Sequence, residues 1–216
     1  FIADRVDWII VDHYALDHRW ESAMRESCRN IMVIDDLADR FHDCDMLLDQ
    51  SLGRTAEDYS NFLEEDTRLL LGPEYAPLRP EFAQWRDMSL ARRQIPELRH
   101  ILVTMGGVDL DNVTERVLVT LAKCRLSNLE QITVVLGSNA PWRGKVSALA
   151  LKMPVRTTVL SKVDNMAELM TSCDLAIGGG GVTTWERCSL GVPSVLMVMA
   201  SNQLNNARHM SHRQAA

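Results

Sequence analysis

The sequence predicts an α/β protein with two Rossmann-like domains, each built on a parallel sheet, of which the first is incomplete. Three observations lead to this prediction. Short β-rich apolar runs alternate with longer amphipathic stretches, which is typical of βαβ units. Pro96 separates two such series. Glycine-rich or polar residues follow three of the runs, at the strand ends where open parallel sheets bind ligands.

The first series, residues 1–95, predicts a partial N-terminal domain. Strands are expected at Trp8–Val11, Ile31–Ile34, Met46–Leu48 and Leu69–Leu71, and helices at Asp17–Cys28 and Pro80–Arg93. The chain opens at Phe1 and reaches a strand pattern almost at once, and it stops within a polar helical stretch. We therefore expect both ends to be truncated, and the opening strand, loop and helix of this domain to be absent.

The second series, residues 96–216, predicts a nearly complete C-terminal domain. Its strands are expected at Ile101–Met105, Ile132–Leu136, Val155–Leu160, Leu175–Ile177 and Ser194–Met199. Its helices are expected at Asp111–Lys123, Met166–Ser172 and Thr184–Leu190.

Composition excludes several classes of protein. The net charge of -6 argues against nucleic-acid binding, although backbone N–H groups can still bind an anionic ligand. No apolar run is long enough to span a bilayer, so no membrane insertion is expected. The cysteines are odd in number and lack C-x-x-C spacing, which favours unpaired thiols in a reducing cytoplasm. They are Cys28, Cys44, Cys124, Cys173 and Cys188.

The most informative motif is Asp174–Glu186, in which a strand runs through four glycines into a helix. Glycines permit positive φ and close approach of a ligand, and a helix N-terminus favours phosphate. A tight turn without a ligand would need fewer glycines than Gly178–Gly181, so binding is favoured. Thr183 and Glu186 have capping-box spacing, yet Glu186 could equally accept hydrogen bonds from ribose hydroxyls. Both interpretations of Glu186 stay open at this point.

A second glycine pair, Gly106-Gly107, also follows a strand and precedes a helix. It could touch a nucleotide or phosphate. A simple strand-to-helix turn, with Asp109 or Asp111 capping the helix, is the favoured interpretation of this pair alone.

Other polar residues carry weaker signals. His13 and Tyr14 follow the first strand, and His13 is either an acid–base group or, more often in such positions, a structural one. Residues 42–45 (His-Asp-Cys-Asp) invite a metal interpretation, but neighbours on one strand alternate faces, so no metal is expected. Asn202 and Gln203 follow the last strand and could bind a ligand or cap a helix.

Taken together, these motifs resemble the UDP-2,4-diacetamido-2,4,6-trideoxy-β-L-altropyranose hydrolases of pseudaminic acid biosynthesis. The similar stretches occur in order along nearly the whole chain, at Val11–Glu21, Val33–Gln50, Leu70–Phe82, Thr104–Asn112 and Ile177–Gln203. The glycine-rich stretch alone would also fit the related glycosyltransferase that makes the peptidoglycan lipid intermediate.

The resemblance implies a glycosyltransferase-B-like fold and a UDP-sugar substrate. Water attacks the anomeric carbon, UDP leaves and the configuration inverts, without a metal or cofactor. The implied diphosphate contacts are Gly179, Gly180, Gly181 and Thr183, and the implied ribose contact is Glu186.

The resemblance also implies roles for five other positions. Gly106 and Gly107 would line the nucleotide pocket, Asn202 and Gln203 would contact substrate, and Tyr14 and Asn202 would lie near the sugar or its attacking water. The general base of the family is a His in a Gly-rich loop after the first strand, upstream of the matching stretches, and His13 is not that residue. We therefore expect this chain alone to be inactive or impaired. A glycosyltransferase of the same fold and a non-catalytic nucleotide-binding module are the alternatives.

Overall fold

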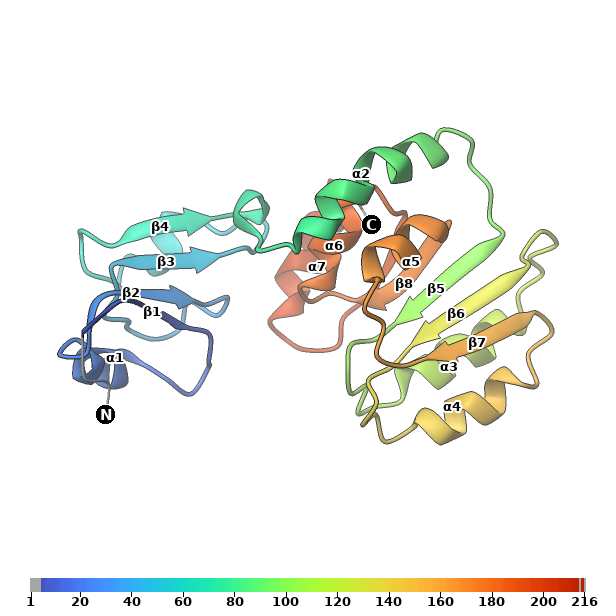
Figure 1. Cartoon of the computed structure of the whole chain (residues 1–216), viewed down its shortest axis with the longest axis horizontal. Helices are drawn as coiled ribbons and strands as arrows, with labels where there is room; N and C mark the ends of the chain where they lie inside the picture. Colours follow the sequence, from blue (N-terminus) through green and yellow to red (C-terminus); the bar gives the residue numbers. More distant parts are fainter. Residues whose placement is uncertain (1–4, 214, 216) are drawn as a thin grey trace. The chain divides into compact units, whose positions relative to one another are not determined.

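The computed structural model describes residues 5–213 and 215, and the chain forms two compact units, Phe1–Pro77 and Leu78–Ala216 (Figure 1). Each unit contains one parallel sheet with its own core. The predicted α/β class with two parallel sheets is therefore confirmed. No helix in residues 5–213 is both long and apolar enough to pass through a bilayer.

The first unit is built on a four-stranded parallel sheet of order β1-β2-β3-β4. The strands are β1 (Val6–Val11), β2 (Cys28–Ile34), β3 (Met46–Asp49) and β4 (Arg68–Leu71), and the helices are α1 (His18–Met24) and the 3₁₀ turns η1 (Ala56–Tyr59) and η2 (Pro73–Tyr75). All four predicted strands are present. The predicted helix Asp17–Cys28 was too long, because Cys28 is fully buried as the first residue of β2.

A buried polar network fixes the carboxyl ends of β2 and β3. The Tyr59 hydroxyl donates to Asp49 Oδ2 at 2.9 Å and to Asp35 Oδ2 at 3.1 Å, and all three residues are buried. Arg54 pairs with Asp49, and Arg40 pairs with Asp35 at 2.9 Å. Because both buried carboxylates have cationic partners, the network holds this edge of the sheet together.

The second unit is built on a five-stranded parallel sheet of order β7-β6-β5-β8-β9. The strands are β5 (His100–Thr104), β6 (Gln131–Val135), β7 (Arg156–Leu160), β8 (Leu175–Gly179) and β9 (Ser194–Met197). The helices are α2 (Pro80–Arg92), α3 (Val113–Leu121), α4 (Arg143–Ala150), α5 (Met166–Ser172), α6 (Thr183–Ser189) and α7 (Gln203–His212). Helix α4 was not predicted, because its sequence buries only Val146 and Ala150.

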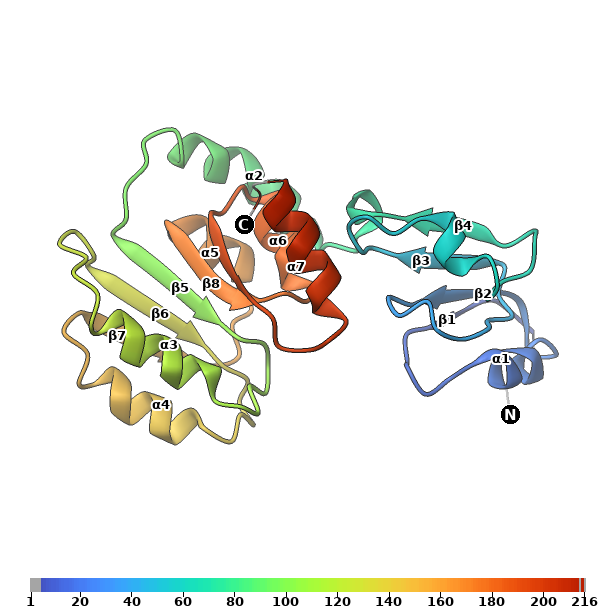
Figure 2. The ribbon, with the colours of Figure 1, turned by 180° about the vertical axis from the view of Figure 1, so that it is seen from behind.

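Helices cover both faces of this second sheet, as strand alternation requires. Ile101 and Val103 of β5 pack in one core with α3 and α4, on the face shown in Figure 2. Leu102, between them, points to the other core, which α2 and α5 cover. The near-continuous apolar run of β5 is therefore buried on both sides, as is typical of parallel sheets.

Helix α2 belongs to the second unit, so the division between the units lies one helix before the predicted boundary at residues 95 and 96. Phe82 is buried in the core beneath α5, and the Ser89 hydroxyl donates to the Leu190 carbonyl at 2.6 Å. Pro96 follows α2 and marks a turn within the second unit. The boundary prediction relied on this proline, whereas the packing of α2 sets the observed division.

Candidate functional site

Three loops meet at the carboxyl edge of the second sheet. Strands β5, β8 and β9 are neighbours, with Thr104 paired to Gly178 and Gly179 paired to Met197. The loops after these strands contain the glycine pair, the last two of the four glycines and the segment leading to α7, while Gly178 and Gly179 end β8 itself. This edge of the sheet is the place where open parallel sheets bind ligands.

The four glycines allow close packing and none has a positive φ, which corrects the expectation of left-handed backbone. A Cβ on Gly178 would lie 2.6 Å from Arg187 Nη1 and 2.9 Å from the Thr104 carbonyl oxygen. A Cβ on Gly180 would lie 3.3 Å from Gln203 Cβ. At Gly181 the nearest atom would be Gln203 Nε2 at 3.8 Å. Close packing therefore requires glycine at Gly178 and leaves little room at Gly180, whereas a Cβ at Gly181 would make only an ordinary van der Waals contact.

The loop leaves a row of backbone donors unused. Gly180 N–H donates inside the protein, to the Met197 carbonyl at 3.1 Å and to Gln203 Oε1 at 3.2 Å. The next three N–H groups, at residues 181–183, have no acceptor within the part of the chain that the structure describes. They form the start of α6, where free N–H groups and the helix dipole favour an anion. Of the predicted diphosphate contacts, Gly181 and Thr183 have free N–H groups and the Gly180 N–H does not, and contact with a diphosphate stays a prediction.

Glu186 is not part of a capping box. Thr183 is the first helical residue, the N-cap position is Val182, and no side chain caps this helix. The Glu186 side chain is only 14% exposed, and its one ion pair, to Arg79 Nη2, is long at 3.8 Å. Burial raises the pKa of its carboxyl above the usual 4.5, partly opposed by Arg79. The capping alternative is thus excluded, and a mostly buried acceptor remains one helical turn beyond the free amides.

The glycine pair after β5 is open to solvent, while the residue beyond it caps a helix. Gly106 has φ of +90°, and a Cβ at Gly106 or Gly107 would meet no atom within 4 Å. Asp109 accepts from the N–H groups of Val113 and Thr114, each at 2.9 Å, at the start of α3. The capping role suggested for Asp109 is confirmed. The glycine pair itself is accessible, so its predicted contact with a nucleotide stays a prediction.

Gln203 braces the glycine loop from the start of α7. Its Oε1 accepts from Gly180 N–H and, at 2.9 Å, from Met199 N–H. The side-chain oxygen is therefore engaged by the protein backbone, although the amide nitrogen lies near Gly181. Asn202 occupies the N-cap position of α7 but its side chain makes no capping hydrogen bond, which removes the capping alternative for this residue.

Tyr14 lies in the first unit, at the carboxyl end of β1. Its hydroxyl donates to Asp36 Oδ1 at 3.0 Å, and burial together with Asp36 raises its pKa to about 12. His13 accepts through Nδ1 from Ala15 N–H at 3.1 Å, which is a local structural role. Because Tyr14 and Asn202 belong to different units, their shared place near a sugar stays a prediction.

The residues first considered as metal ligands are engaged with other side chains. His42 Nδ1 lies 2.8 Å from Glu21 Oε1, and both residues are buried. Asp43 and Asp45 pair with Arg25 at 2.7 and 2.6 Å. In residues 5–213 and 215, no three His, Cys, Asp or Glu side chains are grouped to hold a metal ion.

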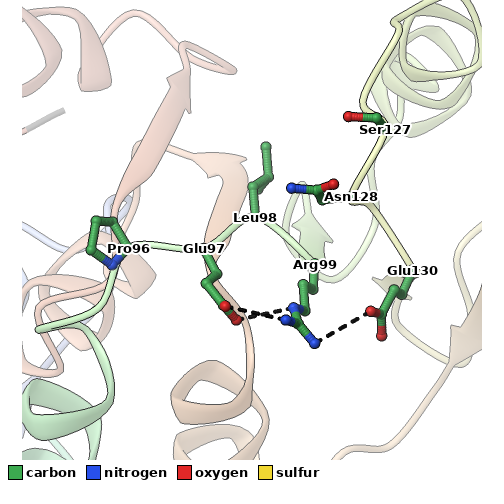
Figure 3. Close-up of a pocket in the computed structure, with 7 residues that line it drawn as sticks. All are labelled: Pro96, Glu97, Leu98, Arg99, Ser127, Asn128 and Glu130. Carbon is green, nitrogen blue, oxygen red and sulfur yellow. Dashed lines mark hydrogen bonds and ion pairs between the residues drawn. The ribbon is translucent and has the colours of Figure 1, made fainter.

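A separate hollow lies at the opposite edge of the second sheet, before the first residues of β5 and β6. Figure 3 shows Arg99 between Glu97 and Glu130, with ion pairs of 3.0 and 3.5 Å. The cation in this hollow is neutralised by the two carboxylates. Because the amino edge of a parallel sheet is not where such folds bind ligands, we do not assign the site here.

Comparison with known families adds to this geometry. The family model for the glycosyltransferase family 28 C-terminal domain matches residues 100–216, which is more than half of the chain and includes the whole carboxyl edge described above. The chain belongs to this family. The match covers β5 to α7 and leaves the first unit outside it.

Curated relatives match most of the chain at low identity. An uncharacterized protein, MJ1062, of Methanocaldococcus jannaschii is 30% identical over 88% of this chain and 40% of its own length. The spore coat polysaccharide biosynthesis protein SpsG of Bacillus subtilis is 27% identical over 72% of the chain and 44% of its length. A UDP-2,4-diacetamido-2,4,6-trideoxy-β-L-altropyranose hydrolase of Campylobacter jejuni is 25% identical over 81% and 60%, respectively.

The chain thus spans less than two thirds of the length of each of these relatives. Among solved structures, MurG of Acinetobacter baumannii superposes with a TM-score of 0.58 and 16% identity, over 96% of this chain and 58% of that one. At this identity the likeness concerns the fold alone, and it supports the predicted glycosyltransferase-B-like architecture.

Proposed function

We propose that this chain is the nucleotide-binding part of an enzyme that hydrolyses a UDP-linked 2,4-diacetamido-2,4,6-trideoxy sugar at the anomeric carbon. The products are UDP and the free sugar, destined for pseudaminic acid synthesis. One observation carries the proposal. Three unused N–H groups at residues 181–183 lie one helical turn before the mostly buried carboxylate of Glu186, at the carboxyl edge of the sheet. Diphosphate and ribose need these two kinds of partner, donors and an acceptor.

Each group has a role in this proposal. The N–H groups of Gly181, Val182 and Thr183 donate to the diphosphate, and Glu186 accepts from the ribose hydroxyls. When water attacks the anomeric carbon, the bond from that carbon to the diphosphate oxygen breaks and UDP leaves with the electron pair. Preorganised N–H donors stabilise the charge that develops on the departing oxygen. Because water enters on the face opposite the leaving group, the configuration inverts.

The remaining predicted contacts belong to the same proposal. Gly106 and Gly107 give the nucleotide access to the loop after β5, and Asn202 lies near the sugar or its attacking water. Gln203 acts mainly by bracing the glycine loop. We expect neither a metal nor a cofactor, and we place the enzyme in the cytoplasm.

Binding of UDP by this chain is the direct test. Isothermal titration should show that UDP binds more tightly than uridine, because uridine cannot use the free amides. CDP serves as a control for the base, since it carries the same diphosphate and ribose. Equal affinity for UDP and uridine would remove the diphosphate site.

A glycosyltransferase with the same donor site is the second candidate, and membership of the family 28 C-terminal domain favours it. Incubating the full-length protein with the UDP-sugar in water separates the two. Hydrolysis predicts release of UDP without an acceptor, measured by chromatography. A strict requirement for an acceptor would replace the hydrolase by the transferase, and binding of UDP without either reaction would indicate a non-catalytic module.

A further inference from the structure

Arg187 is a fully buried arginine directly behind the glycine loop. It is the residue after Glu186 on α6, and it is 1% exposed. Gly178 makes room for it, since a Cβ at that position would lie 2.6 Å from Arg187 Nη1. One of the four glycines is therefore explained by this guanidinium and not by a ligand.

The guanidinium donates to the residues that shape the loop. Nη2 donates to the Gly179 carbonyl at 2.8 Å and to the Thr184 hydroxyl at 3.2 Å, and Nη1 donates to the Thr183 hydroxyl at 3.3 Å. A guanidinium has no acceptor, so the Thr183 oxygen must accept this bond. The hydrogen of that hydroxyl is then directed to another acceptor, at the same helix start as the free amides.

No carboxylate oxygen lies within ion-pair distance of Arg187 in the described part of the chain. The guanidinium takes part in no ion pair there, and its buried Nε has no hydrogen-bond partner. Burial lowers its pKa, with Cys188 and Glu186 acting in the opposite direction. A buried charged group normally has a partner of opposite charge, because transferring a charge from water into the protein interior costs free energy. An anion at the loop would supply the missing charge.

We propose that Arg187 is a positioning residue for the diphosphate: it orients the Thr183 hydroxyl as a phosphate donor and places a buried positive charge without a close ion-pair partner behind the free amides. This inference rests on the function proposed above. Within that site it assigns to Arg187 the preference for a ligand with a diphosphate, such as UDP, over one without, such as uridine. Arg187 does not touch the ligand. It acts through Thr183, the Gly179 carbonyl and its charge.

The test compares UDP with uridine in calorimetric titrations of the whole chain. Arg187→Met should weaken UDP binding by about tenfold or more, the usual effect of losing a charged hydrogen-bonding partner, and leave uridine binding nearly unchanged. Arg93→Met is the matched control. Arg93 is a half-buried arginine whose pKa burial lowers, but it donates to the Met170 and Cys173 carbonyls, at the end of α5. Its removal should leave the ratio of UDP to uridine affinity unchanged.

Thr183→Val gives a second readout that does not depend on the buried position. It should reduce UDP affinity without affecting uridine, and its effect should be much smaller when Arg187 is already Met, because both variants remove the same oriented donor. Thr184→Val removes a hydroxyl that Arg187 also contacts, but Thr184 is buried, so this variant should not change the UDP preference.

The outcomes separate the inference from the function on which it rests. If the parent chain binds UDP no better than uridine, the proposed function is refuted and this inference with it. If the parent chain prefers UDP and Arg187→Met keeps that preference while folded, only the inference is refuted. If Arg187→Met does not fold by circular dichroism, Thr183→Val decides, and an unchanged UDP preference in that variant also refutes it.

Discussion

Replacing Glu186 tests the ribose contact, because the structure removes the competing structural role for this residue. Glu186 takes no part in capping α6, and its ion pair with Arg79 is long and joins a half-exposed partner. Such a pair contributes less than about 1 kcal/mol to stability. The near-isosteric change Glu186→Gln should therefore have little effect on folding at neutral pH.

The effect on ligand affinity should be larger. The carboxylate is only 14% exposed, so its hydrogen bonds to ribose hydroxyls would be charge-assisted and largely shielded from water. Hydrogen bonds to charged groups contribute about 1.5–3 kcal/mol each. Loss of one such bond raises Kd by roughly 10–150-fold. Glu186→Ala should reach this range, and Glu186→Gln should lie below it because the amide keeps one acceptor oxygen.

The assay is calorimetric titration with UDP, together with urea unfolding of each variant. Glu130→Gln is the matched control, since Glu130 is an exposed carboxylate in the same unit at the opposite edge of the sheet. It should leave both UDP affinity and stability unchanged.

Two outcomes would contradict the reasoning. Unchanged UDP affinity in Glu186→Ala would show that the carboxylate does not hold the ribose. A loss of about 1 kcal/mol of unfolding free energy in Glu186→Ala but not in Glu186→Gln, with affinity preserved, would restore the capping interpretation, because Gln can also complete a capping box.

Three further predictions concern stability. Because burial raises the pKa of Glu186, the folded state binds the carboxyl proton more tightly than the unfolded state does. The stabilisation from this group is therefore complete below pH 4.5 and is lost as the pH rises through the raised pKa. In urea unfolding measured across pH, Glu186→Gln should not show this loss of stability, and identical pH profiles of the parent and the variant would contradict the prediction. Gly178→Ala should cost about 1–3 kcal/mol in the same assay, because its Cβ meets Arg187 and a backbone oxygen, and an unchanged midpoint would show that the loop relaxes freely. Tyr59→Phe should destabilise the first unit by about 1–3 kcal/mol, because Asp35 and Asp49 lose the hydroxyl donor that they share. The affinity for UDP should not change. A loss of UDP affinity in this variant would refute the assignment of the nucleotide to the second unit.

Much of the fold follows from local pattern. All nine strands found in the described residues overlap predicted apolar runs, and β5 is a near-continuous apolar segment because it is buried on both faces. Helix α4 was missed because it buries only Val146 and Ala150, so its sequence shows no strong apolar stripe. The boundary between the units was misplaced because only packing shows that Phe82 and Ser89 of α2 belong to the second core.

For the site, the sequence alone proposed the four glycines, the helix after them and Glu186 as candidates, because glycine runs and strand-to-helix junctions are local signals. It could not distinguish a capping Glu from a free one, since both have the same spacing, and only the position of the helix start decided this. Nor could it show that Gly178 accommodates a neighbouring side chain or that Gln203 braces the loop from α7. The role of Arg187 depends on burial and on the absence of a close ion-pair partner in the described residues, and these are properties of three-dimensional packing that no stretch of sequence contains.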